Sequence, residues 1–148
     1  MACDSTSVNL FKVLLTALKL QEAKTERNVI ISDIDNFPTD LYIAQGIRDL
    51  LAGRNLELQF VKRADMVATI NALGSRAIVV MLTQVDYRTG ERYDMREITA
   101  LTQSNCALML WDLAHSKCAF PVELTACNAD LAVGCTYKYL NSGPGAPG

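Results

Sequence analysis

The sequence has little of what several classes of protein need. It contains a single histidine and no CxxC pair, so a zinc site would need several widely separated thiols, and we expect no metal. The net charge is −2 and the basic residues are scattered, which argues against a nucleic-acid-binding surface. No apolar run is long enough to span a membrane. The amino terminus lacks the basic region and cleavage pattern of a secretory signal, so we expect a cytoplasmic protein.

The composition allows a folded core. Half of the 148 residues are hydrophobic, and this length predicts one domain. The cysteines are odd in number, which argues against a disulfide framework, and we expect reduced thiols in or near the core. They are Cys3, Cys106, Cys118, Cys127 and Cys135.

Helix-like and strand-like patterns alternate along the chain. Strands are expected over residues 28–34, 56–61, 76–82, 107–111 and 130–135, and helices over 8–20, 38–52, 63–73 and 94–104. Gly53 and Gly74 are expected to end two of the helices, residues 21–27 to form a polar connection, and residues 113–128 to be irregular. This alternation predicts an α/β fold with a mainly parallel sheet and helices on both faces.

Polar residues follow three of the expected strands. Thr83, Asp112 and Lys138 each come just after an apolar segment, and in a parallel sheet they would lie at the carboxyl edge, where ligands bind. A carboxylate and an amine at that edge suit pyridoxal phosphate (PLP), which needs a charged ring nitrogen and a covalent amine partner. The alternatives are a solvated surface lysine and an aspartate that caps the turn after its strand.

Two expected helix starts also allow two interpretations. The hydroxyl groups around Thr6 and Ser7 are typical of helix capping, but they could also bind an anion together with the first N–H groups of the helix. Pro38 and Asp40 suit the first turn of the second helix. Phe37, just before it, could be a hydrophobic residue that fixes the helix entry or a ring that stacks on a ligand.

Four segments of the chain resemble the kynureninase family. They are STSVNLFKVL (residues 5–14), NFPTDLYIAQG (36–46), DLAHS (112–116) and ADLAVGCTYKYLNSGPGAP (129–147). The resemblance implies the aspartate-aminotransferase fold of PLP enzymes, called fold type I. It also implies that residues 1–148 are the central part of the PLP-binding large domain, without an N-terminal segment and a C-terminal small domain. The family's enzymes are homodimers.

The resemblance also implies a role for each matching residue. Lys138 would bind the cofactor aldehyde covalently and later move protons. Asp112 would pair with the ring nitrogen, Phe37 would stack on the ring, and Asp40 would lie close by. His115 would lie against the cofactor or orient Asp112. The other positions expected to bind the cofactor are Pro38 and Thr39 in the FPTD motif and, near the phosphate, Thr6, Ser7, Thr83 and Tyr137.

The implied reaction is hydrolytic cleavage of the Cβ–Cγ bond of L-kynurenine or 3-hydroxykynurenine, giving anthranilate or 3-hydroxyanthranilate and L-alanine. It belongs to tryptophan catabolism and NAD biosynthesis. Lys117, Cys118 and Ser142 depart from the family pattern; Lys117 adds a cation near the cofactor loop, and Ser142 replaces a glycine. We expect this chain alone to have weak or no activity. The alternatives are a lyase similar to cysteine desulfurases, which would use the same lysine and aspartate, and a non-catalytic α/β binding module.

Overall fold

The computed structural model describes residues 1–22 and 27–148, and the polar connection expected over residues 21–27 lies in part outside them. Helices and strands alternate in these residues as the sequence predicts. The helices are α1 (Thr6–Leu20), α2 (Pro38–Leu50), α3 (Met66–Leu73) and α4 (Met95–Ser104), with short 3-10 turns at Ala52–Arg54 and Arg63–Asp65. The strands are β1 (Val29–Asp33), β2 (Glu57–Val61), β3 (Ala77–Thr83), β4 (Leu108–Asp112) and β5 (Leu131–Val133).

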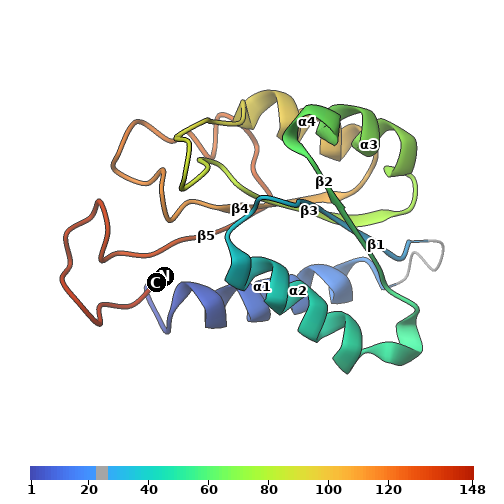
Figure 1. The fold of residues 1–148 in the computed structure, drawn as a ribbon, viewed down its shortest axis with the longest axis horizontal. Helices are drawn as coiled ribbons and strands as arrows, with labels where there is room; N and C mark the ends of the chain where they lie inside the picture. The colour runs from blue at the N-terminus through green and yellow to red at the C-terminus, as the bar shows by residue number, and fades with distance from the viewer. Residues whose placement is uncertain (23–26) are drawn as a thin grey trace.

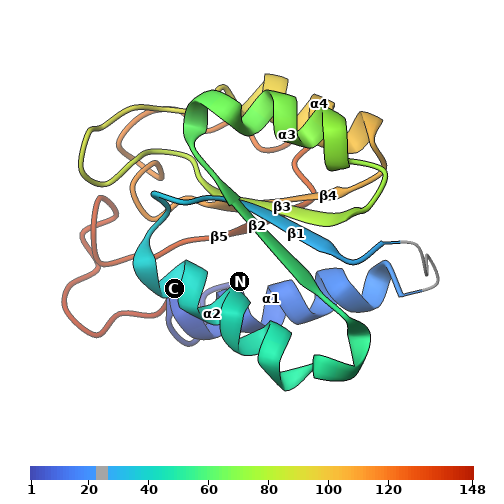
Figure 2. The same ribbon diagram turned by 45° about the vertical axis from the view of Figure 1, so that its right-hand side comes forward.

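The strands form one parallel sheet in the order β2-β1-β3-β4-β5. Helices α1 and α2 cover one face and α3 and α4 the other, as Figure 1 and the turned view in Figure 2 both show. The predicted α/β fold with helices on both faces is therefore confirmed. All seven residues of β3 are buried, which explains why its sequence is continuously apolar rather than alternating.

Two hydrophobic cores lie on the two faces of the sheet. Successive strand residues point to opposite faces, so Ile30 joins the core under α1 and α2, and Ile31 joins the core under α3 and α4. In the same way, Leu110 and Trp111 of β4 divide between the two cores. Each fully buried side chain of this size contributes about 1.5–3 kcal/mol. The apolar strands therefore hold both helix layers in place.

The carboxyl ends of the strands meet along one edge of the sheet. Thr83 pairs with Asp112, and Asp112 with Val133, so the ends of β3, β4 and β5 are level. The connection from β1 to β2 runs through α2 on one face of the sheet, and the connection from β2 to β3 runs through α3 on the other face. The strand order thus reverses between β1 and β3, and this is the place where open α/β sheets bind ligands.

Some element ends differ from the predicted ones. Helix α2 ends at Leu50, before Gly53, and the left-handed residue that follows the next turn is Asn55, with a φ of 51°. Strand β5 is shorter than the expected 130–135. Its first expected residue, Asp130, uses its side chain instead of its backbone to accept the Met109 N–H, at 2.8 Å.

The five thiols are free, but only Cys135 is buried. Cys106 and Cys118 are exposed, so the expectation that the cysteines lie in or near the core was wrong for these two. The two ends of the chain lie side by side (Figure 1). The Cys3 N–H donates to Gly148 O at 3.0 Å, and the Gly148 N–H donates to Asp4 O at 2.9 Å. No helix in residues 1–22 and 27–148 is both long and apolar enough to cross a membrane.

Candidate functional site

Lys138 lies in the loop after β5, at the carboxyl edge of the sheet. Its Nζ is 2.9 Å from His115 Nε2 and 5.6 Å from the centroid of the Phe37 ring. With Lys138 as an ammonium group, which only donates hydrogen bonds, Nε2 is the acceptor and the imidazole proton is assigned to Nδ1. The side chain is thus partly buried and bound to its neighbours, which is unlike a freely solvated lysine.

Two buried carboxyl groups lie next to this amine. Asp40 and Asp112 are each 2% exposed. Burial, and then the nearby charge of Asp112, raises the pKa of Asp40 to about 8. Burial also raises the pKa of Asp112, while its hydrogen bond from the Ala114 N–H, at 2.8 Å, and the charge of Lys138 oppose the rise. Asp40 is therefore protonated near neutral pH, and its hydrogen bond to Asp112 lowers the pKa of Asp112 and so opposes the effect of burial.

A chain of hydrogen bonds fixes the turn that carries Phe37 and Asp40. The Thr83 hydroxyl donates to Asn36 Oδ1, and the Phe37 N–H donates to the same oxygen at 2.7 Å. Asn36 Nδ2 donates to Ser32 Oγ at 3.0 Å, and the Ser32 hydroxyl donates to Met81 O at 2.6 Å. The start of α2 is thereby joined to β1 and β3. Thr83 also lies beside Asp112, because the two residues are paired in the register of β3 and β4.

Phe37, Tyr87 and His115 form a cluster of three rings, of which Phe37 and His115 lie against Lys138. Phe37 lies 5.3 Å from Tyr87 and 6.3 Å from His115, measured between ring centroids, and Tyr87 lies 6.2 Å from His115. Burial and the charge of Lys138 lower the pKa of His115. His115 contacts Lys138, a neighbour that the sequence did not predict, and it makes no hydrogen bond to Asp112 in the described residues, where Asp112 accepts the Ala114 N–H instead. Its predicted place against the cofactor stays a prediction.

The expected phosphate residues lie at the same edge but are less closely connected. Ser5 caps α1 by accepting the Val8 N–H at 3.3 Å, so Thr6 and Ser7 lie in its first turn. Thr6 Oγ1 is buried and has no hydrogen-bond partner in the described residues. A Cβ placed on Gly148 would lie 2.8 Å from both the Thr6 N and Gly134 O, so the start of α1 lies beside the end of β5.

Tyr137 is 46% exposed, and burial, then the charge of Cys135, raises its pKa. Among the described residues it makes no hydrogen bond to the Thr6 or Ser7 side chain. In the FPTD motif, Pro38 is exposed at the first position of α2 and Thr39 is partly buried.

Two of the three departures from the family pattern, Lys117 and Ser142, lie outside the cluster of Lys138, His115, Phe37 and Tyr87, and the third, Cys118, is exposed. Lys117 is exposed and lines a cavity of about 710 Å³ beside β5, together with Lys12 and Thr136. Among the lysines of residues 1–22 and 27–148, Lys138 is the one whose charge shifts the pKa of Asp40, Asp112 and His115. Ser142 does not take the left-handed conformation that a glycine would favour, whereas its neighbours Asn141 and Gly143 do, with φ of 54° and 85°.

Sequence reasoning missed Asn36 and Tyr87. Asn36 could have been found, because it stands between a buried strand and a proline-started helix, where polar side chains reach the carboxyl edge. Tyr87 gives no comparable signal. It lies in a polar loop, and only the folded chain brings this loop against Phe37 and His115.

Solved structures of the PLP-dependent transferase fold superpose on this chain, so the predicted fold class is confirmed. A cysteine desulfurase from Thermococcus onnurineus superposes with a TM-score of 0.75 at 20% identity, covering 94% of this chain and 34% of its own. A cystathione gamma lyase from Micromonospora echinospora gives 0.73 at 13% identity, covering 99% and 36%. An alanine–glyoxylate aminotransferase from Nostoc sp. gives 0.68 at 17% identity, covering 99% and 38%. At these identities the likeness shows the fold alone.

The sequence is much more similar to kynureninases. It is 49% identical over 144 residues to the kynureninase of Pseudomonas fluorescens and 51% identical over 144 residues to that of Deinococcus radiodurans. It is 50% identical over 145 residues to that of Burkholderia mallei. Each match covers 97% of this chain but only 33% or 34% of the relative, so the chain spans about a third of the length of the curated relatives it matches. No family model matches. The predicted resemblance to kynureninase is therefore confirmed over nearly the whole chain.

Proposed function

We propose that this chain is the central part of the large domain of a PLP-dependent enzyme that hydrolyses L-kynurenine or 3-hydroxykynurenine. The observation that carries the proposal is a sequence identity of 49–51% to kynureninases over 97% of the chain. The products would be L-alanine and anthranilate or 3-hydroxyanthranilate. Pairing of two copies into a homodimer, in a cytoplasmic enzyme, is part of the same proposal.

The residues at the carboxyl edge fit PLP. Asp40 Oδ2 and Thr6 Oγ1 are buried polar atoms without a hydrogen-bond partner in the described residues, and buried polar atoms are ordinarily paired. Asp112 would keep its negative charge next to the ring nitrogen, and the start of α1 would accept the phosphate. PLP, when bound, supplies an electron sink that stabilises negative charge on neighbouring carbon atoms of a substrate.

The side chains of this chain would then bind the ring and move protons. The Lys138 amine would hold the aldehyde carbon until a substrate amine displaces it, and would afterwards carry a proton to or from the substrate. His115 Nε2, 2.9 Å from Lys138 Nζ, would orient the amine and accept a proton from it. The uncharged Asp40 carboxyl would stabilise the Asp112 carboxylate without adding a second negative charge.

Further segments are needed to complete the site. Strand β5 pairs only with β4 among the described strands, so its other edge is open. The 710 Å³ cavity beside it has apolar walls, which include Leu113, Val122 and Val133. This open edge and cavity would pack against the parts of the enzyme that make up the other two thirds of the relatives, including the group that binds the substrate carboxylate.

The first test measures cofactor binding by the 148-residue chain. The purified chain is mixed with PLP, reduced with borohydride and digested, and the pyridoxyl-labelled peptide is mapped. A visible absorbance band and a label on Lys138 would show that these residues bind PLP covalently. Lys117→Met is the matched control, because Lys117 is an exposed lysine outside the cluster. A label spread over surface lysines would show that the site does not form in this chain.

The second test measures activity in a chimera. The matching 144 residues of the Pseudomonas fluorescens kynureninase are replaced by the corresponding residues of this chain. Release of anthranilate from L-kynurenine, abolished by Lys138→Ala, is the expected result. A folded chimera that binds PLP but leaves kynurenine intact would contradict the proposed reaction. Conversion of cysteine to alanine, with release of sulfide when a thiol reductant is added, would instead favour the desulfurase alternative.

A further inference from the structure

The imidazole of His115 is held without a hydrogen bond on its second nitrogen. Nε2 contacts Lys138, whereas Nδ1 is buried and has no partner in the described residues. When the orientation of a histidine matters, a carbonyl or carboxylate ordinarily accepts the proton of the second nitrogen. Another contact must therefore keep this ring against the lysine.

Two aromatic rings provide that contact. The Tyr87 ring is tilted by 32° to the His115 ring and the Phe37 ring by 49°, at centroid distances of 6.2 and 6.3 Å. Tyr87 and Phe37 meet edge to face, at 5.3 Å and 81°. Aromatic rings attract each other at separations of about 4.5–7 Å. The three rings form a closed triangle, so each one restricts the other two.

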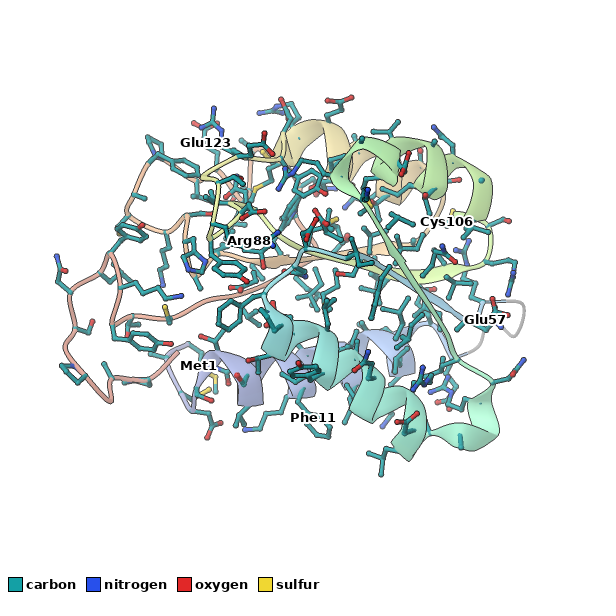
Figure 3. All side chains as sticks on the ribbon, in the orientation of Figure 1. Met1, Phe11, Glu57, Arg88, Cys106 and Glu123 are labelled. Carbon is teal, nitrogen blue, oxygen red and sulfur yellow. The ribbon has the colours of Figure 1, made fainter. Side chains whose placement is uncertain are left out.

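The loop that carries Tyr87 is itself fixed. Asp86 Oδ1 accepts the N–H groups of Arg88 at 2.7 Å and Thr89 at 3.1 Å. Burial alone would raise the pKa of Asp86, but these hydrogen bonds and the Arg88 guanidinium lower it. Arg88 Nη2 lies 2.8 Å from Asp35 Oδ1, two residues before Phe37. Figure 3 shows Arg88 next to the end of the sheet where this site lies. Arg88 therefore ties the Tyr87 loop to the turn that carries Phe37.

We propose that Tyr87 is a positioning residue, which together with Phe37 holds the His115 imidazole against the Lys138 amine. The Arg88–Asp35 ion pair keeps the Tyr87 loop in place. The importance of the Lys138 amine rests on the proposed function, but the positioning concerns only contacts within this chain. The Tyr87 hydroxyl makes no hydrogen bond to the described residues, so its ring carries the contact. Replacing Tyr87 by phenylalanine should therefore keep His115 in position, and replacing it by leucine should not.

The single histidine makes the proposal testable by NMR, because every imidazole signal comes from His115. The wild-type chain is compared with Tyr87→Leu, Tyr87→Phe and Tyr42→Leu, the last being a control at an exposed tyrosine on α2. In the wild type, Tyr87→Phe and Tyr42→Leu, we expect nuclear Overhauser effects from His115 to Lys138 and Phe37, and ring protons shifted upfield. In Tyr87→Leu, we expect the effect to Lys138 to be lost and the ring protons to move toward the values of a free imidazole.

Several outcomes decide the proposal. Tyr87→Leu with unchanged effects to Lys138 would overturn it, and so would their loss in Tyr87→Phe. Tyr87 is 40% exposed, so the truncated chain should fold, and the fluorescence of the single tryptophan, the buried Trp111, checks this. If Tyr87→Leu does not fold, Arg88→Met is the second variant, because it keeps all three rings. We expect weaker nuclear Overhauser effects from His115 to Lys138 in Arg88→Met. Unchanged effects in Arg88→Met would contradict the role of the Tyr87 loop.

The NMR measurement needs no PLP. A wild-type chain that takes no label on Lys138 would show that the PLP site does not form in this chain, and the spectra would still decide the positioning. If the chain is labelled, Tyr87→Leu should be labelled several-fold more slowly than Tyr87→Phe. Equal rates would overturn the link between Tyr87 and the amine.

Discussion

The two edges of the sheet differ in how fully their polar groups are hydrogen-bonded. At the amino edge, Arg27 donates to the carbonyls of Gly74, Ala77 and Asn105, at 2.5–2.9 Å. Arg76 donates to both Asn28 and Glu57 there. One buried polar atom beside the amino edge, Gln21 Oε1, has no partner in the described residues. At the carboxyl edge, five residues have such atoms: Thr6, Asp40, Gln84, His115 and Ser116. Figure 3 shows Glu57 and Cys106 at the first edge and Arg88 toward the other. The charged groups of the amino edge are thus paired within the chain, whereas several buried polar atoms of the carboxyl edge are not, which is what the proposed ligand site requires.

The largest expected effect is at the carboxyl edge. Replacing Lys138 by alanine should abolish the borohydride-stable pyridoxyl label, because no other amine contacts His115 and Phe37 within the described residues. The free energy of unfolding should change little, since the side chain is only partly buried. Mass spectrometry of the reduced, digested chain measures the label, and urea unfolding measures the stability. A full label in Lys138→Ala would show that another lysine binds PLP.

The next effect depends on pH. The pKa of Asp40 is about 8 in the folded chain, against an ordinary 3.8. Between these values the folded state holds a proton that the unfolded state has lost. The free energy of unfolding should therefore fall as the pH rises, by at most about 1.4 kcal/mol per pH unit, and level off above pH 8. Asparagine imitates the uncharged acid, so Asp40→Asn should match the wild type near pH 4 and be more stable at pH 8.

Urea unfolding without PLP, followed by Trp111 fluorescence at several pH values, measures this dependence. The matched control is Glu57→Gln at the amino edge. Hydrogen bonds from Arg76 and Asn28 lower the pKa of Glu57, so its contribution should be lost as the pH falls, the opposite direction. Parallel stability curves for the wild type and Asp40→Asn would show that Asp40 is not protonated in the folded chain.

A smaller effect is expected at the amino edge. Arg27→Met removes a cation that donates to three backbone carbonyls, and hydrogen bonds from charged groups are worth about 1.5–3 kcal/mol. We expect a loss of about 2 kcal/mol in the free energy of unfolding. Labelling of Lys138 in the folded variant should be unchanged. Reduced labelling at a urea concentration where Arg27→Met is fully folded would contradict the separation of the two edges.

The smallest effect is expected in the loop after Lys138. Ser142→Gly should change the free energy of unfolding by less than about 0.5 kcal/mol, because Ser142 is not in a left-handed conformation. Asn141→Gly offers a comparison, because Asn141 does take the left-handed conformation, with a φ of 54°. Thermal unfolding of the two variants measures the difference. A clear gain in stability from Ser142→Gly would show that the serine strains this loop.

The fold could be predicted from the sequence because its signals are local. Apolar periodicity located α1 and α4, and a continuously apolar run located β3. The strand-end rule also located Thr83 and Asp112. The ends of α2 and β5 could not be located in this way. They depend on the left-handed Asn55 and on the bond between Asp130 and Met109, which joins residues far apart in the sequence.

The contacts within the site were harder to predict than its members. Residue types and motifs indicated Lys138, Asp112 and His115, but not that His115 contacts the lysine instead of the aspartate. Tyr87 could not be predicted, because its contacts with Phe37 and His115 form only after three separate loops come together. The roles predicted for these residues in binding PLP stay predictions until the labelling experiment is done.

The pairing of the two chain ends has a consequence for how this unit can be handled. Cys3 and Gly148 are joined by a backbone hydrogen bond of 3.0 Å, so both ends leave the fold at one point. A unit with adjacent ends can be inserted into a host protein as a cassette, or closed by a short linker and reopened at an exposed turn such as the one at Gly90. A circularly permuted chain would then keep the same sheet, although its strands would be synthesised in a different order.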